Sequence, residues 1–138
     1  MPTNFGKYGL VGVTKHEFEK EPDWYWNIKA ITSGMELDNS KFLAHRRLVA
    51  TADGRTELPP TVMEVAFHEI ALCYGGTNIP EDESKAVEDG GAPIIPEGAS
   101  VDLIKEKLRI FPREILMEIW RAIGEVYPFW GPIDPNAV

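Results

Sequence analysis

The sequence predicts a mainly α fold: a small helical domain of about four helices with a short N-terminal β-strand or hairpin. Residues 100–111 and 112–126 carry most of this prediction, because both repeat apolar side chains at helical spacing. An apolar run at 61–74 adds a third helix, and residues 35–49 add a fourth. A chain of 138 residues is near the commonest domain size, so we expect residues 1–138 to form a single domain.

The expected β structure lies near the N-terminus. Residues 1–13 contain three glycines and are expected to form a flexible arm. Residues 23–32, DWYWNIKAIT, are rich in aromatic and β-branched side chains, and this composition favours a strand. One face of that strand would carry Trp24, Trp26, Ile28, Ala30 and Thr32. A helix through Trp24, Ile28 and Ile31 also fits the segment, and both alternatives stay open.

The helix at 35–49 is expected to turn Leu37, Phe42 and Leu43 towards the core. The segment ATADGRTELPP then connects it to the next helix. Within this connection, Asp53-Gly54 is a strong turn signal, which makes a small hairpin possible. Pro59-Pro60 suits the first turn of the helix that follows, because proline is tolerated there.

The helix at 61–74 is expected to lie at the centre of the domain. Thr61, Glu64 and His68 form a polar stripe at helical spacing, and apolar residues occupy most of the remaining circumference. Such a broad apolar face is typical of a helix that packs on several sides. Gly75-Gly76 is expected to end this helix.

Two further segments are expected to lack regular structure. Residues 77–98 form a long acidic loop with several glycines and prolines, whose far end Ile94-Ile95 would fix to the body. Residues 127–138, YPFWGPIDPNAV, contain three prolines and cannot continue the preceding helix. They are expected to form a Pro-rich tail.

The last two helices have the clearest boundaries. Ser100 is expected to cap the first, which ends near Phe111, and Pro112 to open the second. The first would bury Val101, Ile104, Leu108 and Phe111. The second would bury an apolar stripe made up of Ile115, Leu116, Ile119, Trp120, Ile123 and Val126. Its solvent-facing side would carry Glu114, Glu118, Arg121 and Glu125.

The charge distribution argues against a nucleic-acid partner. The net charge is −8, and the whole excess of carboxylates lies in residues 59–138. Phosphate groups would be repelled there, because nucleic-acid affinity rests on cationic side chains. The small basic cluster of Lys41, His45, Arg46 and Arg47 is interpreted as a solvated helix end. No membrane partner is expected either, because no apolar run approaches the ~18 residues that a span needs.

The sequence offers no pattern typical of an enzyme. His68-Glu69 resembles the start of a zinc-binding helix, but position 72 is Leu, where the second histidine would be required. Cys73 is the only cysteine, which rules out thiolate zinc sites and an intramolecular disulfide. It is interpreted as a small buried hydrophobe. We therefore expect no catalytic residue, metal or cofactor.

Aromatic residues gather in two places. Trp24 and Trp26 lie in the expected strand, and Tyr127, Phe129 and Trp130 follow the last helix. Packing against the core is one interpretation of these five residues. The other is a partner-binding surface, because Trp and Tyr dominate the anchors of protein interfaces.

The order of these features resembles the tail assembly chaperones of long-tailed, siphovirus-like bacteriophages. The segments that carry the resemblance are DWYWNIKAITSGMELDNSKFL, ELPPTVMEVAFHEIALCYGGTNIP and the closing ASVDLIKEKLRIFPREILMEIWRAIGEVYPFWGP. The closing match uses Leu108, Pro112, Glu114, Ile115, Ile119 and Pro128. The chain departs from the family pattern at Phe111, where leucine is usual, and in its long 77–98 loop.

The resemblance implies a binding protein with no catalytic residues. Its partner would be the tape measure protein, possibly with the tail tube protein, and the chain could form a homo-oligomer. It would act in the host cytoplasm, be absent from the mature virion, and have a longer form made by ribosomal frameshifting. A structural virion protein at the head–tail joint or tail is the alternative. An enzyme would require a pocket with perturbed carboxylates around His68.

Overall fold

A computed structural model describes residues 13–52 and 62–132, with side chains for 13–42 and 63–132. Several expectations therefore lie outside the described residues. They are the arm at 1–12, the turn at Asp53-Gly54, the helix start at Pro59-Pro60, the tail beyond 132, and the side chains of Leu43, His45, Arg46 and Arg47.

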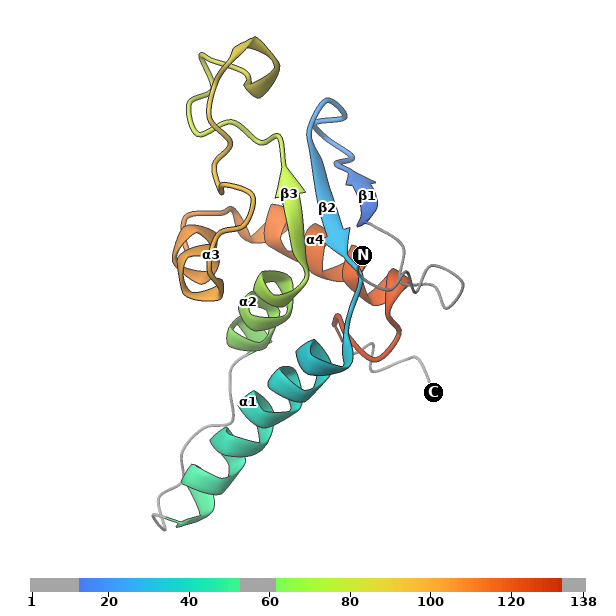
Figure 1. Ribbon diagram of the computed structural model, residues 1–138, viewed down its shortest axis with the longest axis vertical. Helices are drawn as coiled ribbons and strands as arrows, with labels where there is room; N and C mark the ends of the chain where they lie inside the picture. The colour runs from blue at the N-terminus through green and yellow to red at the C-terminus, as the bar shows by residue number, and fades with distance from the viewer. Residues whose placement is uncertain (1–12, 53–61, 133–138) are drawn as a thin grey trace, which may run out of the picture.

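The described residues form a mixed α/β fold (Figure 1). The expectation of a mainly α domain with one short strand or hairpin is wrong, because strands on both sides of the predicted one complete a three-stranded antiparallel sheet in the order β1-β2-β3. Four α-helices are present in this part of the chain. In chain order the elements are β1 (Val13–Glu17), β2 (Tyr25–Lys29), α1 (Ser33–Ala52), α2 (Val62–Leu72), β3 (Tyr74–Thr77), the 3-10 helix η2 (Val87–Asp89), α3 (Val101–Leu108) and α4 (Arg113–Val126).

The central strand β2 confirms the strand interpretation of residues 23–32 and excludes the helical one. It pairs with β1 from Val13 opposite Lys29 to Glu17 opposite Tyr25. Trp26 and Ile28 are fully buried on one face of the strand, as period-two alternation predicts. Ala30 and Thr32 lie beyond its end.

Strand β3 contains Gly75-Gly76, which the sequence predicted as the end of the preceding helix, whereas α2 ends at Leu72. Trp26 lies opposite Thr77 and Ile28 opposite Tyr74, so the two glycines face the single residue Asn27 in a β-bulge. A Cβ atom on Gly75 would lie 2.8 Å from Val13 Cγ1 and 3.1 Å from the Asn27 carbonyl oxygen. A side chain at position 75 would therefore crowd these strands and force Val13 to shift.

The core lies between the sheet and helices α2, α3 and α4, with α4 behind the sheet in Figure 1. The central place of α2 is confirmed, because it contacts each of the other three helices. The Ser100 cap is also confirmed: its Oγ accepts a hydrogen bond from the Leu103 N–H at 3.2 Å. Most of the predicted inward stripe of the last two helices is buried, namely Ile104, Leu108, Leu116, Ile119, Trp120 and Ile123.

Three predictions of side-chain direction are wrong. Leu37 is 54% exposed on α1 instead of facing the core. His68, assigned to a polar stripe, is buried beneath the Phe42 ring, with the ring centroids 4.1 Å apart. Glu118 is half-buried instead of facing water, because its Oε2 lies 2.6 Å from His16 Nε2 on β1.

The 77–98 segment is more ordered than a solvated loop. It begins in β3, contains η2, and is crossed by a β-bridge between Pro80 and Pro93. Its far end is fixed as predicted, because Ile95 is fully buried. In Figure 1 the segment rises above the sheet, while α1 extends from the opposite end of the molecule. Over the described ranges, the helices include none with the length and apolar character to cross a bilayer.

Candidate functional site

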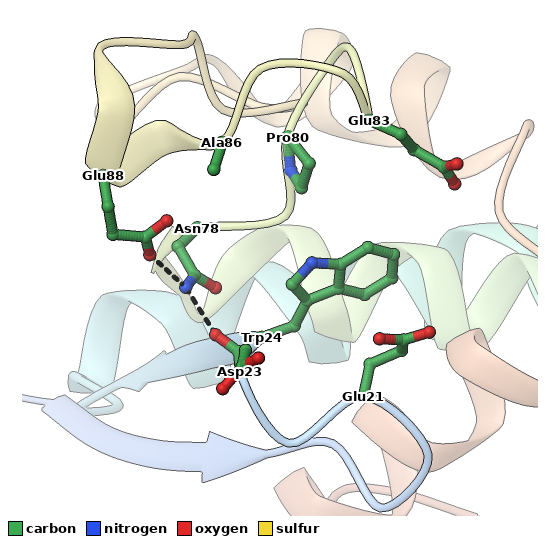
Figure 2. Close-up of a pocket in the computed structure, with 8 residues that line it drawn as sticks. All are labelled: Glu21, Asp23, Trp24, Asn78, Pro80, Glu83, Ala86 and Glu88. Atoms are coloured by element: carbon green, nitrogen blue, oxygen red, sulfur yellow. Dashed lines mark hydrogen bonds between the residues drawn. The ribbon is translucent and has the colours of Figure 1, made fainter.

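A surface depression lies between the β1–β2 turn and the 77–98 segment (Figure 2). We call it the acidic hollow. Its volume is about 620 Å³, and the half-buried indole of Trp24 extends across it from the β1–β2 turn. The lining residues are Glu21, Asp23, Trp24, Asn78, Pro80, Glu83, Ala86 and Glu88.

Asn78 holds the two sides of the acidic hollow together. Its buried side-chain Nδ2 donates to the Asp23 carbonyl oxygen at 2.7 Å and to Glu88 Oε1 at 2.9 Å. Its Oδ1 accepts a hydrogen bond from the Tyr25 N–H at 2.7 Å. One amide thus fixes the β1–β2 turn against the 77–98 segment, and the width of the hollow depends on it.

The 77–98 segment is also fixed from within. The Glu81 N–H donates to the Ala92 carbonyl oxygen at 2.9 Å, and the Ile94 N–H donates to the Ile79 carbonyl oxygen at 2.7 Å. At its far end, the phenol of Tyr74 donates to the Ile95 carbonyl oxygen at 2.5 Å. Burial raises the pKa of this phenol, so it stays protonated as a donor.

Carboxylates are the only charged side chains among the described residues that line the acidic hollow. Glu21, Asp23, Glu83 and Glu88 line it, and no lysine or arginine is among the described residues that do so. The hydrogen bond from Asn78 lowers the pKa of Glu88, because it stabilises the ionised carboxylate. A cation would therefore be attracted to this hollow.

A second depression, the apolar groove, lies on the other side of Trp24. Its volume is about 240 Å³, and Trp24, Pro80 and Glu83 line both it and the acidic hollow. Ile110 is 70% exposed at this groove, in the α3–α4 corner. The remaining lining residues are Ile79, Glu81, Ile94, Phe111, Pro112 and Ile115.

The structure separates the five predicted partner-binding aromatics. Trp24 lines both depressions, but Trp26 is fully buried, with its ring centroid 4.9 Å from that of Tyr74. Tyr127, Phe129 and Trp130 follow α4, whereas the apolar groove uses residues at the start of that helix. A helix of this length spans about 20 Å, so the two groups do not form one surface.

The C-terminal aromatics differ from one another in exposure. Phe129 is 98% exposed. Trp130 is only 6% exposed and belongs to the core. Tyr127 is half-buried, and its hydroxyl donates to the Lys29 carbonyl oxygen at 3.3 Å and accepts from the Ile31 N–H at 3.1 Å. Tyr127 and Trp130 thus pack on the body, whereas Phe129 between them extends into water.

Sequence reasoning missed Asn78, Pro80 and Ile110 as parts of a site. The apolar pair Ile110-Phe111 beside Pro112 was a usable signal, since an apolar residue at a helix corner has no helical face to join. Asn78 gave no signal, because its partners come from distant parts of the chain. The carboxylates of the 77–98 segment identify it as acidic, but their pattern does not predict a depression.

His68 lines neither the acidic hollow nor the apolar groove. Burial, together with the smaller effect of the nearby Lys105 charge, lowers the pKa of its imidazole to about 4. Within residues 13–52 and 62–132, no three His, Cys, Asp or Glu side chains are grouped closely enough to hold a metal ion. No protein-family model, curated protein or solved structure matches this chain.

Proposed function

We propose that this chain is a tail assembly chaperone of a long-tailed bacteriophage. It binds the tape measure protein and keeps that protein soluble until tail tube subunits polymerise around it. The observation that carries the proposal is the apolar groove with the exposed Ile110 at its edge. The resemblance of the closing helix pair to the chaperone family supports the same conclusion.

The groove has the physical properties of a surface that another chain covers. Burying an isoleucine side chain that water now contacts contributes roughly 1.5–3 kcal/mol. Grooves lined by apolar side chains commonly accept one face of an amphipathic helix. The walls are held in place by Asn78 and by buried Ile95, so binding requires little ordering of the groove itself.

The acidic balance of the chain suits a protein that coats an apolar partner. A net charge of −8 keeps copies of the chain, and complexes that contain them, apart in solution. The exposed Phe129, at the other end of α4, is a second place where a long partner could be contacted. A tape measure protein is long enough to reach both places.

Co-expression with the tape measure protein of the same phage tests the proposal. We expect the soluble fraction of the tape measure protein to rise when this chain is present. Ile110→Ser should reduce that rise, whereas Leu37→Ser, which changes an exposed leucine on α1, should not. Both variants should melt like the parent protein, since both side chains are largely in water.

A tape measure protein that stays equally insoluble with and without this chain would refute the chaperone role. Mass spectrometry of purified phage particles distinguishes the alternative, a structural virion protein. A chaperone is absent from the particles, whereas a head–tail joint or tail protein is retained at a fixed copy number.

A further inference from the structure

We infer that the apolar groove and the acidic hollow together bind a helical segment in which an arginine follows an apolar residue by one turn. The inference rests on the proposed function for the identity of the partner, and adds the chemistry of the segment bound. The apolar residue enters the groove beside Ile110 and Ile115. The arginine reaches past Trp24 into the acidic hollow.

The residues that line both depressions determine how far apart the apolar residue and the arginine lie in the bound segment. Trp24, Pro80 and Glu83 line both, so an occupant of the groove is adjacent to the hollow. Side chains three or four residues apart on a helix lie about 5–6 Å from each other on one face. A helix that places an apolar side chain in the groove can therefore place its next same-face residue across Trp24.

The chemistry of the hollow selects a cation. Figure 2 shows the Trp24 indole with the carboxylate of Glu21 below it and that of Glu83 above. Trp is the aromatic residue that attracts cations best, and a guanidinium both stacks on an indole and pairs with carboxylates. Arginine is thus favoured over lysine, whose compact ammonium is more strongly hydrated.

The groove alone would accept many apolar segments, so charge complementarity decides the occupant. Glu81 and Glu83 lie at the groove, and Glu21, Asp23 and Glu88 extend the negative charge into the hollow. An acidic amphipathic helix would meet like charges there. A basic one gains attraction at the same positions, so the surface discriminates between segments of similar hydrophobicity.

Fluorescence anisotropy with labelled helical peptides tests the inference. The first peptide carries leucine at i and arginine at i+4, and three matched peptides change one feature each. They replace arginine by glutamate, replace leucine by serine, or move the arginine to i+2. We expect the first peptide to bind at least tenfold more tightly than each of the others, and its binding to weaken as salt is raised.

Two variants and two controls locate the binding surface. Ile110→Ser should weaken binding of the first peptide about tenfold, and Glu83→Gln about two- to fivefold. Leu37→Ser and Glu106→Gln change exposed residues of the same types outside both depressions and should leave binding unchanged. Equal binding of the glutamate peptide, or parental affinity in both site variants, would overturn the inference.

This experiment and the co-expression test fail separately. Peptide binding at the groove, with a tape measure protein that stays insoluble, leaves the inference standing and removes the chaperone role. The reverse result is a tape measure protein that becomes soluble while peptide binding depends neither on peptide charge nor on the site variants. That result keeps the chaperone role and refutes the inference.

Discussion

The buried carboxylate of Glu69 accepts a hydrogen bond from the indole Nε1–H of Trp120 at 2.8 Å, across the contact between α2 and α4. The same oxygen accepts a hydrogen bond from the Gly131 N–H at 2.9 Å, and the other oxygen accepts one from Asn39 Nδ2 at 2.9 Å. One side chain therefore joins α1, α2, α4 and the segment after α4. Buried polar groups of this kind are costly to leave unpaired.

Removing the Glu69 carboxylate should strongly destabilise the fold. Glu69→Ala leaves three N–H donors without their acceptor, and we expect the free energy of unfolding to fall by about 3 kcal/mol or more. Glu69→Gln keeps one acceptor oxygen and should cost less. Urea denaturation followed by circular dichroism measures both, with the exposed Glu125→Ala as control. A Glu69→Ala midpoint equal to that of the control would contradict the role assigned to the carboxylate.

Truncation of Trp130 should destabilise the fold strongly, whereas truncation of its neighbour Phe129 should have almost no effect. Trp130→Ala should lower the free energy of unfolding by about 3–5 kcal/mol, because the indole is almost fully buried. Phe129→Ala should leave it within about 0.5 kcal/mol, because the ring is almost entirely in water. Thermal melts of the two variants make the comparison, and similar melting temperatures would show that residues 129–130 are not packed as described.

Protonation of His68 should lower the free energy of unfolding as pH falls. Its folded pKa of about 4 lies below the usual 6.5, so the unfolded chain binds more protons between these values. The contribution is fully present above pH 6.5 and is lost as pH falls towards 4. It amounts to no more than about 3 kcal/mol.

Urea denaturation at pH 7, 6 and 5 checks this dependence. The parent protein should lose more stability over this range than His68→Leu, which has no group to protonate. Titration of the His68 ring by NMR gives the folded pKa directly. A midpoint near 6.5 would contradict its burial under Phe42.

Cys73 should be unreactive in the folded protein. Burial, together with the smaller effect of the Glu69 charge, raises the pKa of its thiol to about 12, so almost no thiolate exists at pH 8. A thiol reagent such as DTNB should modify the native chain only slowly and the urea-unfolded chain at once. Rapid reaction of the native protein would show that the site around Cys73 is open to solvent.

The sequence predicted the elements whose signals are local. Ser100 predicted α3 and the apolar stripe that begins at Ile115 predicted α4, because capping and helical periodicity depend on neighbours within a few residues. Strand β2 followed from its aromatic alternation. The type of these elements needed no knowledge of the rest of the chain, but their ends did: β2 covers only Tyr25–Lys29, and α3 ends at Leu108 instead of near Phe111.

The missed features depend on contacts between distant residues. Gly75-Gly76 has low strand propensity, and only the close approach of Val13 and Asn27 explains its place in the sheet. Glu69 could not be recognised as buried, because its donors come from three other segments. The candidate site depends on distant contacts in the same way. Trp24 was predicted as a contact residue, but the turn that carries it is held beside the 77–98 segment by Asn78.

The bonds of Glu69 have a consequence for the newly made chain. The sheet can be completed once Thr77 is available, but Trp120 and Gly131 reach their acceptor only much later. At about 5–20 residues per second, roughly 3–10 seconds of synthesis separate Thr77 from Gly131. During that interval the nascent polypeptide exposes apolar surface of α2 that α4 will later cover, so slowed translation of this stretch would favour aggregation before folding is complete.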